Sequence, residues 1–531
     1  MVASSELRGL RARVHSRGRR LLLAAVVVLG AVLRLQGLTF GMPSFWHPDE
    51  RPAAMAVHEC VRGRSAERRY RHPPLFVKTA CRLEMGARAL LPAPPPRIVR
   101  ELLAMRSVSA AAGTATIAFV YLVALRLMGV GAALGAAALL AVFPSAVMSS
   151  KYGAPDSLMT MLLVAALWLH LRLAERGRSI DLVAAAAVTT LAVAAKYNAA
   201  FLCFPFALAF AAAARSRGRS ILSPGPLLVT AATILVVAGL AFSTAIAEGE
   251  IAKVFRGASA EGRHLASAGH FGFALGPAEG GLLFHFRHSI LPASGPLLLV
   301  AVVAGLATMA LRGGFAGWLT LAFAVPYYVV VELIFKVPPS FERYALPLVP
   351  VYVLAAALVA ERLSSRLSGR AGAVVLAALL AIEVAVPLAR TVQVLDVIND
   401  DTRARMRGWL KVNLEEGETV YAQWPSMTFY YPGTSGRSRL KAVDGLLKDR
   451  TPQTGVLFLA SSLVYQRYLE FPDQEPRWTE FYRRLFAEGQ LLHEESAGDG
   501  TYMFHNPVLR LYRFDPPPAE PKRKGRDHDR G

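Results

Sequence analysis

Long apolar runs, most of them close to 20 residues, constrain the fold more than any other feature of this sequence. An α-helix needs about 20 apolar residues to cross the hydrocarbon core of a bilayer. Hydrophobic residues make up 54% of the 531 residues and charged residues only 18%, which is too apolar for a soluble protein of this length. We therefore predict a polytopic α-helical membrane protein with about 11 transmembrane helices. The expected spans are 21–39, 104–125, 129–148, 155–173, 181–195, 198–214, 224–246, 291–311, 315–335, 344–361 and 372–392.

The first run follows six arginines between Arg8 and Arg20, a pattern that also suits a signal peptide. No small-residue cleavage site follows the run, and Arg34 and Trp46 come next, so we expect a retained span. The stretch 181–214 could be one helix that carries Lys196 in its middle. A lysine at the centre of a span costs about 2.5–3.5 kcal/mol, which favours two short helices with Lys196 at their outer turn.

Arginine clusters in three short loops predict the orientation of the chain. The loops at 172–178, 215–219 and 362–370 are basic, and basic loops stay in the cytoplasm. If the N-terminus is also cytoplasmic, eleven crossings satisfy all three loops and place the C-terminal segment outside. The excess of 59 Lys+Arg over 38 Asp+Glu largely flanks the apolar runs, so we expect no nucleic-acid partner.

The remaining stretches define the domain organisation. Residues 1–20 form a basic cytoplasmic N-terminus, and 21–395 form the transmembrane domain. Near 396 the composition turns soluble, and strand-like stretches at 419–422 and 456–462 with a helix-like stretch at 478–486 predict a small extracytoplasmic α/β domain up to 514. Two outer loops, 40–103 and 247–290, and a disordered tail at 515–531 complete the organisation.

Unusual polar residues collect on the outer side of this topology. Asp49 and Glu50 come directly after the first span, in the sequence Trp46-His47-Pro48-Asp49-Glu50. One carboxylate of such a pair can act as a base while the other orients it. The alternative is a helix N-terminus, where acidic residues are favoured in the first turn.

Four further outer segments hold candidate binding residues. For each, a structural role is the alternative: a proline-started helix, a cap, or a cation that snorkels to the interface. Several cations on one face would instead form a phosphate site. The residues are His72 and Lys78 around the Pro73-Pro74 turn, Lys151, Tyr152 and Asp156 between spans three and four, Lys196 and Tyr197 at the next outer turn, and Arg343 and Tyr344 after Pro338-Pro339-Ser340-Phe341-Glu342, with Arg106 at the outer end of span two.

The sequence predicts no metal ligands, although it leaves dependence on a divalent cation open. No HExxH motif, CxxC pair or GxxxxGK[ST] phosphate loop occurs. A single histidine such as His47 or His72 is more often a hydrogen-bonded structural group than a ligand. Cys60 and Cys81 share the first outer loop, where either a disulfide or two free thiols would fit.

These motifs, in this order, resemble those of the GT-C superfamily of membrane glycosyltransferases, and family 39 and its bacterial relatives most. The acidic pair after the first span resembles that of the family, and His72-Pro73-Pro74-Leu75 with Lys78 is similar to its HPPLxK-like turn. Tyr152 with Asp156, Lys196-Tyr197-Asn198 and Arg343-Tyr344-Ala345-Leu346-Pro347 resemble its later outer motifs. The family includes protein O-mannosyltransferases and the lipid A aminoarabinose transferase.

The resemblance implies an inverting transfer of a sugar from a polyprenyl-phosphate donor to an acceptor outside the cytoplasm. Asp49 would be the general base, Glu50 would orient the acceptor, and Asp156 would assist in binding. Arg106, Lys196 and Arg343 would hold the donor phosphate. The acceptor is a lipid, a polysaccharide or a protein, and Phe76-Val77 before Lys78 departs from the mannosyltransferase pattern, which has Gly there.

The main alternative is a transporter or flippase of lipid-linked saccharide. Such a protein should carry ionisable residues near the midplane on broken helices, whereas here the charges lie at one rim. A non-enzymatic envelope protein is a second alternative, but it would not need the acidic pair. The Arg- and Ala-rich composition favours the inner membrane of a bacterium.

Overall fold

The computed structural model divides the chain into two compact units. The first unit comprises Met1–Met42 and Asp49–Ile398, and the second comprises Pro43–Pro48 and Asn399–Gly531. The structure describes residues 2–64, 72–90, 95–218, 220–263, 281–334, 342–415, 418–423, 439–442, 454–498 and 505–515. The predicted tail beyond Asp515, the residues Pro338–Phe341, and His264 and His270 of the second outer loop lie outside these ranges.

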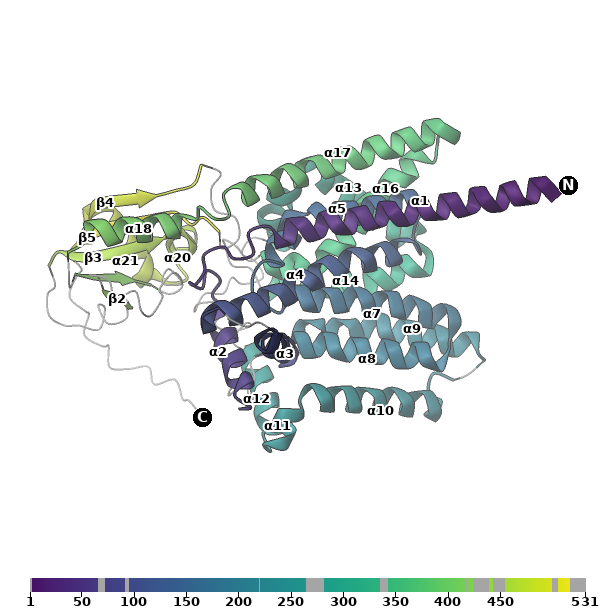
Figure 1. Ribbon diagram of the computed structural model, residues 1–531, viewed down its shortest axis with the longest axis horizontal. Coiled ribbons are helices and arrows are strands. Elements are labelled where there is room, and N and C mark those ends of the chain that lie inside the picture. The colour runs from purple at the N-terminus through teal and green to yellow at the C-terminus, as the bar shows by residue number, and fades with distance from the viewer. Residues whose placement is uncertain are drawn as a thin grey trace. The chain divides into compact units, whose positions relative to one another are not determined.

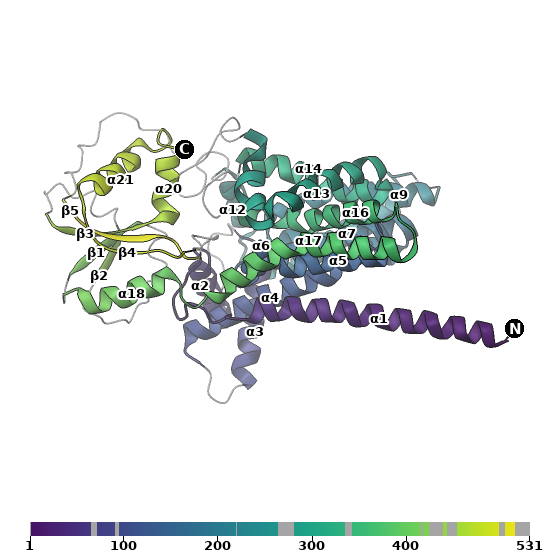
Figure 2. The same ribbon diagram turned by 90° about the horizontal axis from the view of Figure 1, so that it is seen from above.

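The first unit is helical, and its long helices run side by side (Figures 1 and 2). Each of the eleven predicted spans contains a helix. These helices are α1 (Val2–Leu35), α4 (Arg97–Ala124), α5 (Val130–Val142), α7 (Asp156–Arg176), α8 (Ser179–Ala195), α9 (Cys203–Ser216), α10 (Pro224–Ala241), α13 (Leu291–Arg312), α14 (Gly314–Ile334), α16 (Val349–Ser364) and α17 (Gly369–Asp396).

Eight helical stretches in the described part of the chain are long and apolar enough to cross a membrane. Two more apolar helices, α5 and α8, are shorter. The prediction of a polytopic helical membrane protein is thus confirmed, while the count of eleven stays a prediction. The short helix α6 (Pro144–Ser149) follows α5, because Pro144 removes a backbone donor and suits a new helix start.

Small residues allow the helices of the first unit to pack closely. Helix α7 packs against α4, α8 and α9, and α13 packs against α16. A Cβ added at Gly305 would lie 2.1 Å from the carbonyl oxygen of Ala355, so the α13 and α16 backbones touch at this glycine. Close backbone approach at small residues is the usual way in which transmembrane helices associate, because lipid gives no hydrophobic drive between them.

Short helices occupy both predicted outer loops. In the first loop, α2 (Glu50–Val61) and α3 (Leu75–Leu90) pack together, and a disulfide between Cys60 and Cys81 joins them. The helix α11 (Ser243–Ala247) lies at the end of the predicted span 224–246, and the second loop contains α12 (Ile251–Arg263) and the short helical turns Gly281–Leu283 (η3) and Phe286–Ile290 (η4). Before α16, the chain forms α15 (Glu342–Ala345) and the turn η5 (Leu346–Leu348).

The second unit is an α/β domain with a five-stranded sheet of order β2-β1-β3-β5-β4. Strand β1 pairs in parallel with β2 and β3, while β5 runs antiparallel to β3 and β4. Every residue of β3 is buried, as expected for a central strand covered on both faces. Helix α18 covers one face and α20 and α21 the other (Figure 2). The elements are α18 (Thr402–Asn413), β1 (Thr419–Ala422), β2 (Arg439–Ala442), β3 (Val456–Ser461), α20 (Ser462–Glu470), α21 (Pro476–Glu488), β4 (Gln490–Glu495) and β5 (Leu509–Phe514).

Candidate active site

Asp49 and Arg343 form the first ion pair of the site. Asp49 occupies the N-cap position of α2, yet its side chain makes no capping hydrogen bond. Instead, Arg343 of α15 donates a hydrogen bond from Nη1 to Oδ2 of Asp49 at 2.5 Å. The Asp49 side chain is 31% exposed and that of Arg343 only 8%. The carboxylate is therefore within reach of a solute, while the guanidinium is held inside the protein.

Asp156 and Lys196 form a second ion pair beside the first. Asp156 begins α7, and Lys196 follows the end of α8 in an extended conformation. Lys196 Nζ donates to Asp156 Oδ1 at 2.7 Å, and the other carboxylate oxygen of Asp156 is buried without a hydrogen bond from the described residues. The Asp156 carboxylate also interacts electrostatically with Arg343 and Asp49. We call these four residues the two-pair cluster.

Tyr344 links the two cations of the cluster. Lys196 Nζ lies 5.3 Å, and Arg343 Cζ 5.2 Å, from the centroid of the buried Tyr344 ring. Cations at this distance from an aromatic ring are attracted by its quadrupole. The hydroxyl of Tyr327 donates to the backbone carbonyl of Tyr344 at 3.0 Å, which fixes the turn between α15 and α16. Aromatic contact thus helps to hold both cations on one side of the site.

Glu50 and Arg106 are paired with each other inside the first unit. Both side chains have no exposed surface, and Arg106 Nε donates to Glu50 Oε1 at 2.8 Å. Arg106 Nη1 donates to the carbonyls of Leu38 and Phe40, and Glu50 Oε1 also accepts from the Gly153 amide. Because both groups have protein partners, this geometry favours bracing of the loop before Asp49 over direct contact with a donor.

Lys151 and Tyr152 are likewise buried. Lys151 Nζ donates to the carbonyls of Arg34 and Gln36, at the end of α1. Burial, with further contributions from the charges of Arg34 and Arg106, lowers the pKa of Lys151 to about 7. The Tyr152 ring packs edge-on against Phe40. Both residues therefore hold the turn before α7 against the end of α1.

The other predicted binding residues lie on the outer loop and the next turn. Lys78 donates to the Ala241 carbonyl at 2.8 Å and the Ser243 hydroxyl at 3.0 Å, which ties α3 to the end of α10. Burial, with a further contribution from Arg82, lowers the pKa of Lys78. His72 is exposed before α3, and Tyr197 is half-buried in the turn after Lys196.

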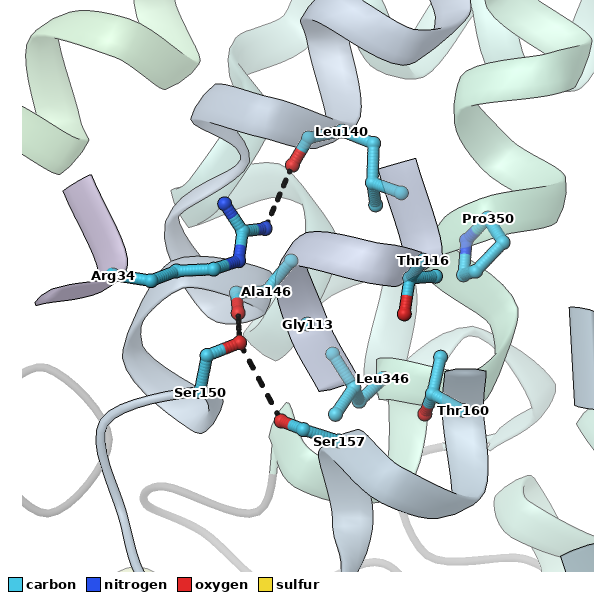
Figure 3. Close-up of a pocket in the computed structure, with 10 residues that line it drawn as sticks. All are labelled: Arg34, Gly113, Thr116, Leu140, Ala146, Ser150, Ser157, Thr160, Leu346 and Pro350. Atoms are coloured by element: carbon cyan, nitrogen blue, oxygen red, sulfur yellow. Dashed lines mark hydrogen bonds between the residues drawn. The ribbon is translucent and has the colours of Figure 1, made fainter. Parts of the chain in front are cut away.

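A small cavity in the first unit is lined in part by Arg34, to which sequence reasoning assigned no role (Figure 3). Arg34 is fully buried and donates to the carbonyls of Gly30, Leu140 and Ala141, while its Nε has no partner among the described residues. The space amounts to about 10 Å³, roughly what one water molecule needs. An arginine inside an apolar run was the available signal, since such residues are costly in membranes. Serine and threonine side chains line the cavity, namely Thr116, Ser150, Ser157 and Thr160.

In the described part of the chain, no three His, Cys, Asp or Glu side chains lie close enough to hold a metal ion. The acidic groups of the site are instead paired with cations. Chemically, the two-pair cluster offers one accessible carboxylate beside two cations. In such an arrangement the carboxylate can accept a proton, and the neighbouring cations can stabilise an anion.

Comparison with known proteins places this geometry in context. Residues 99–242 match the family model described as dolichyl-phosphate-mannose-protein mannosyltransferase. A search of curated protein sequences finds no match.

Several solved structures share the fold. One is ArnT from Cupriavidus metallidurans bound to undecaprenyl phosphate, with a TM-score of 0.53 and 13% identity over 93% of this chain and 98% of that one. Another is the oligosaccharyltransferase of Archaeoglobus fulgidus tethered to an acceptor peptide, with a TM-score of 0.53 and 14% identity over 91% of this chain and 73% of that one. A third is the oligosaccharyltransferase AglB of the same organism with dolichol-phosphate, with a TM-score of 0.50 and 13% identity over 78% and 63% of the two chains. Residues 99–242 thus match a family model of membrane glycosyltransferases, and the chain as a whole shares the fold of these solved transferases.

Proposed function

We propose that this protein is an inverting glycosyltransferase that moves a sugar from a polyprenyl-phosphate donor to an acceptor outside the cytoplasm. The observation that carries the proposal is the two-pair cluster, in which the accessible Asp49 carboxylate lies 2.5 Å from Arg343 and shares its electrostatic environment with Asp156 and Lys196. Undecaprenyl phosphate in ArnT and dolichol-phosphate in AglB support a lipid-phosphate donor.

The proposed reaction uses the cluster at two points. Asp49 accepts the proton of the acceptor hydroxyl, whose oxygen attacks the anomeric carbon of the donor sugar. The bond from that carbon to the phosphate oxygen breaks, and the lipid phosphate leaves with both electrons. Arg343 and Lys196 stabilise the charge that develops on the phosphate, because preorganised cations act strongly beside a low-dielectric wall. Attack opposite to the leaving phosphate inverts the anomeric centre.

Asp156 is proposed to position Lys196 rather than to act as the base. Its carboxylate is 3% exposed and already bound to Lys196, whereas Asp49 is reachable. Glu50 and Arg106 would act one step further away, since they brace the peptide on which Asp49 is presented. This assignment separates the residues proposed to touch substrate from those proposed to hold the fold.

Orientation follows from the same proposal. The disulfide between Cys60 and Cys81 fits an oxidising compartment, and it lies on the loop that carries Asp49. With the three arginine-rich loops on the cytoplasmic side, the site and the second unit face outward. In a bacterium this orientation corresponds to the periplasmic face of the inner membrane.

The test compares Asp49→Asn with the wild type. Membranes that contain either protein would receive radiolabelled undecaprenyl-phosphate mannose or undecaprenyl-phosphate aminoarabinose, with total envelope lipid and glycan as acceptor. We expect Asp49→Asn to insert normally and to lose transfer by about 10²–10⁴-fold, the usual contribution of a general base. Glu59→Gln, which changes another carboxylate on α2, should retain wild-type transfer.

A wild-type rate for Asp49→Asn would remove the assigned base. If neither labelled sugar is transferred by the wild-type protein, mass spectrometry of envelope glycans with and without the gene identifies the missing sugar. That sugar then replaces the two probes in the same comparison. An envelope without any difference would argue against a transferase.

A further inference from the structure

Six residues that directly precede Asp49 belong to the second unit. The chain leaves the first unit after Met42, contributes Pro43–Pro48 to the second unit, and returns at Asp49. Within this segment Ser44, Trp46 and His47 are 1%, 3% and 2% exposed. The predicted first outer loop is therefore interrupted by a short segment that packs with a domain whose remaining residues begin at Asn399.

Arg403 of α18 contacts both the backbone and the side chain of Trp46 in this segment. Its Nη1 donates to the carbonyl oxygen of Trp46 at 2.6 Å. The guanidinium carbon also lies 4.8 Å from the centroid of a Trp46 ring. Arg403 itself is 1% exposed, so both contacts are shielded from water and stronger than they would be at a surface.

The guanidinium is in turn fixed by Asp401. Arg403 donates from Nε to Asp401 Oδ1 at 2.7 Å and from Nη2 to Oδ2 at 2.8 Å, a bidentate pair of high geometric specificity. The Asp401 carboxylate also accepts from the Asn506 amide at 2.9 Å and lies 3.0 Å from Nδ1 of His505. The Arg403 backbone amide donates to Asp401 Oδ1 as well, so residues of the second unit fix the orientation of the Arg403 guanidinium.

A second contact from the same helix holds the beginning of the segment. Arg407, one turn after Arg403, donates from Nη1 to the Ser44 hydroxyl at 3.0 Å. The two arginines thus bind the segment at both Ser44 and Trp46. Only two residues separate Trp46 from Asp49, so the Cα atoms of Trp46 and Asp49 are at most about 11 Å apart.

We propose that Arg403 is a positioning residue for catalysis, which fixes the peptide leading into Asp49 and thereby the placement of the general base. The inference rests on the proposed function, because it assigns Asp49 as that base. A misplacement of about 1 Å in a reacting group can reduce the rate about 10²-fold. A base that begins a helix immediately after a rigidly held segment has little freedom to drift. The second unit, in this proposal, serves turnover even though Arg403 touches no substrate.

The test is the Arg403→Lys variant, which keeps a positive charge beside Asp401 but loses the planar fork that reaches both Asp401 and Trp46. We expect kcat for transfer from the labelled undecaprenyl-phosphate sugar to fall about 10²-fold, while KM for this donor stays within about twofold. Hydrogen exchange of the amides at 44–50 should become faster, with the protection of β3 unchanged. The last measurement separates a loosened segment from an unfolded domain.

Arg405→Gln is the matched control. Arg405 lies on the same helix and forms ion pairs with Asp400 and Glu495, but these partners are outside the held segment. This variant should retain both the kcat of the wild type and slow exchange at 44–50. If Arg403→Lys fails to fold, Ser44→Ala combined with Arg407→Gln tests the same idea without exposing a buried charge, and a smaller fall in kcat is expected.

Two outcomes would overturn the proposal. One is faster exchange at 44–50 with wild-type kcat, and the other is a rise in donor KM at unchanged kcat. Failure of the proposed function would be distinguishable, because Asp49→Asn would then retain transfer whatever Arg403 does.

Discussion

At the scale of the single residue, Arg343 has both an observed partner and a proposed role. Its guanidinium is bound to Asp49 at 2.5 Å, and the same group is proposed to hold the donor phosphate. A phosphate that draws on Arg343 weakens the pull of that cation on the Asp49 carboxylate, which makes the carboxylate a better base. Under the proposed function, the ion pair would therefore couple donor binding to the basicity of Asp49.

Replacement of Arg343 should impair donor binding more than acceptor binding. We expect Arg343→Ala to lower kcat/KM for the labelled donor about 10²–10³-fold, the range found when one preorganised donor to a developing anion is lost. Arg343→Lys keeps the charge without the bidentate fork and should recover part of the loss. Rates measured against donor concentration check this expectation.

Arg390→Gln provides the control for that comparison, since Arg390 lies on another helix, α17, and donates a hydrogen bond to Gln393 of the same helix. Unchanged donor affinity in Arg343→Ala would instead assign the residue a structural role at the membrane interface.

The sequence predicts which individual residues could meet, but not which hydrogen-bond or ion-pair partner each of them has. Asp49, Asp156, Lys196 and Arg343 come together because alternate crossings return the chain to the same side of the membrane. The internal pairing of Glu50 with Arg106 could not be foreseen, because both motifs resemble substrate-binding patterns until the distance between them is known.

At the scale of the element, a disulfide joins α2, which follows the proposed base Asp49, to α3. The Cys60–Cys81 disulfide closes a loop with a sequence separation of 21 residues. In the chain-entropy account, a loop of this length contributes about 3 kcal/mol, because it restricts the unfolded chain. Lys78 adds a polar contact from α3 to α10.

We predict that Cys60→Ser/Cys81→Ser lowers the thermal stability of the protein and reduces transfer through loss of the α2–α3 arrangement. Thermal unfolding in detergent, followed with and without reductant, is the measurement. Reductant should lower the melting temperature of the wild type and leave the double variant unchanged. Equal sensitivity of both proteins would show that the disulfide contributes nothing to stability.

Periodicity and composition reveal the long helices of the first unit because the membrane imposes their length. The same reasoning does not predict the outer helices: 40–103 and 247–290 read as loops, yet α2, α3 and α12 lie within them. Short amphipathic helices at an interface carry weaker patterns, and their formation depends on packing against neighbours.

At the scale of the whole molecule, the two units rest on different interactions. The first is built mainly from close packing of Ala-, Leu- and Val-rich helices around buried ion pairs such as Glu50–Arg106, and the second contains the buried Asp401 cluster. Burial alone would raise the pKa of Asp401, but the charge and hydrogen bonds of Arg403, with those of His505, lower this pKa below its usual range. A carboxylate whose pKa is lowered by folding stabilises the folded state only while it is ionised.

The sign of this linkage predicts acid sensitivity of the second unit. The stabilisation is fully present above the unfolded-state pKa of Asp, about 4, and is lost as the pH falls below it toward the folded-state pKa. Tryptophan fluorescence of the full chain should therefore change on acidification below about pH 4. Asp401→Asn should be less stable at neutral pH and show a flatter dependence on pH. Identical pH profiles for the two proteins would contradict the assignment.

The segment Pro43–Pro48 is made early but packs with residues that are made late, which has a consequence for biosynthesis. Trp46 and its partner Arg403 are 357 residues apart in the chain. At a translation rate of about 5–20 residues per second, the segment waits roughly 20–70 s for the helix that will receive it. A ribosome that stalls before α18 leaves a chain with its membrane helices inserted but the approach to Asp49 unanchored. If Arg403 has the proposed positioning role, truncated products would reach the membrane in an inactive form, and only chains whose synthesis and export are complete would be active.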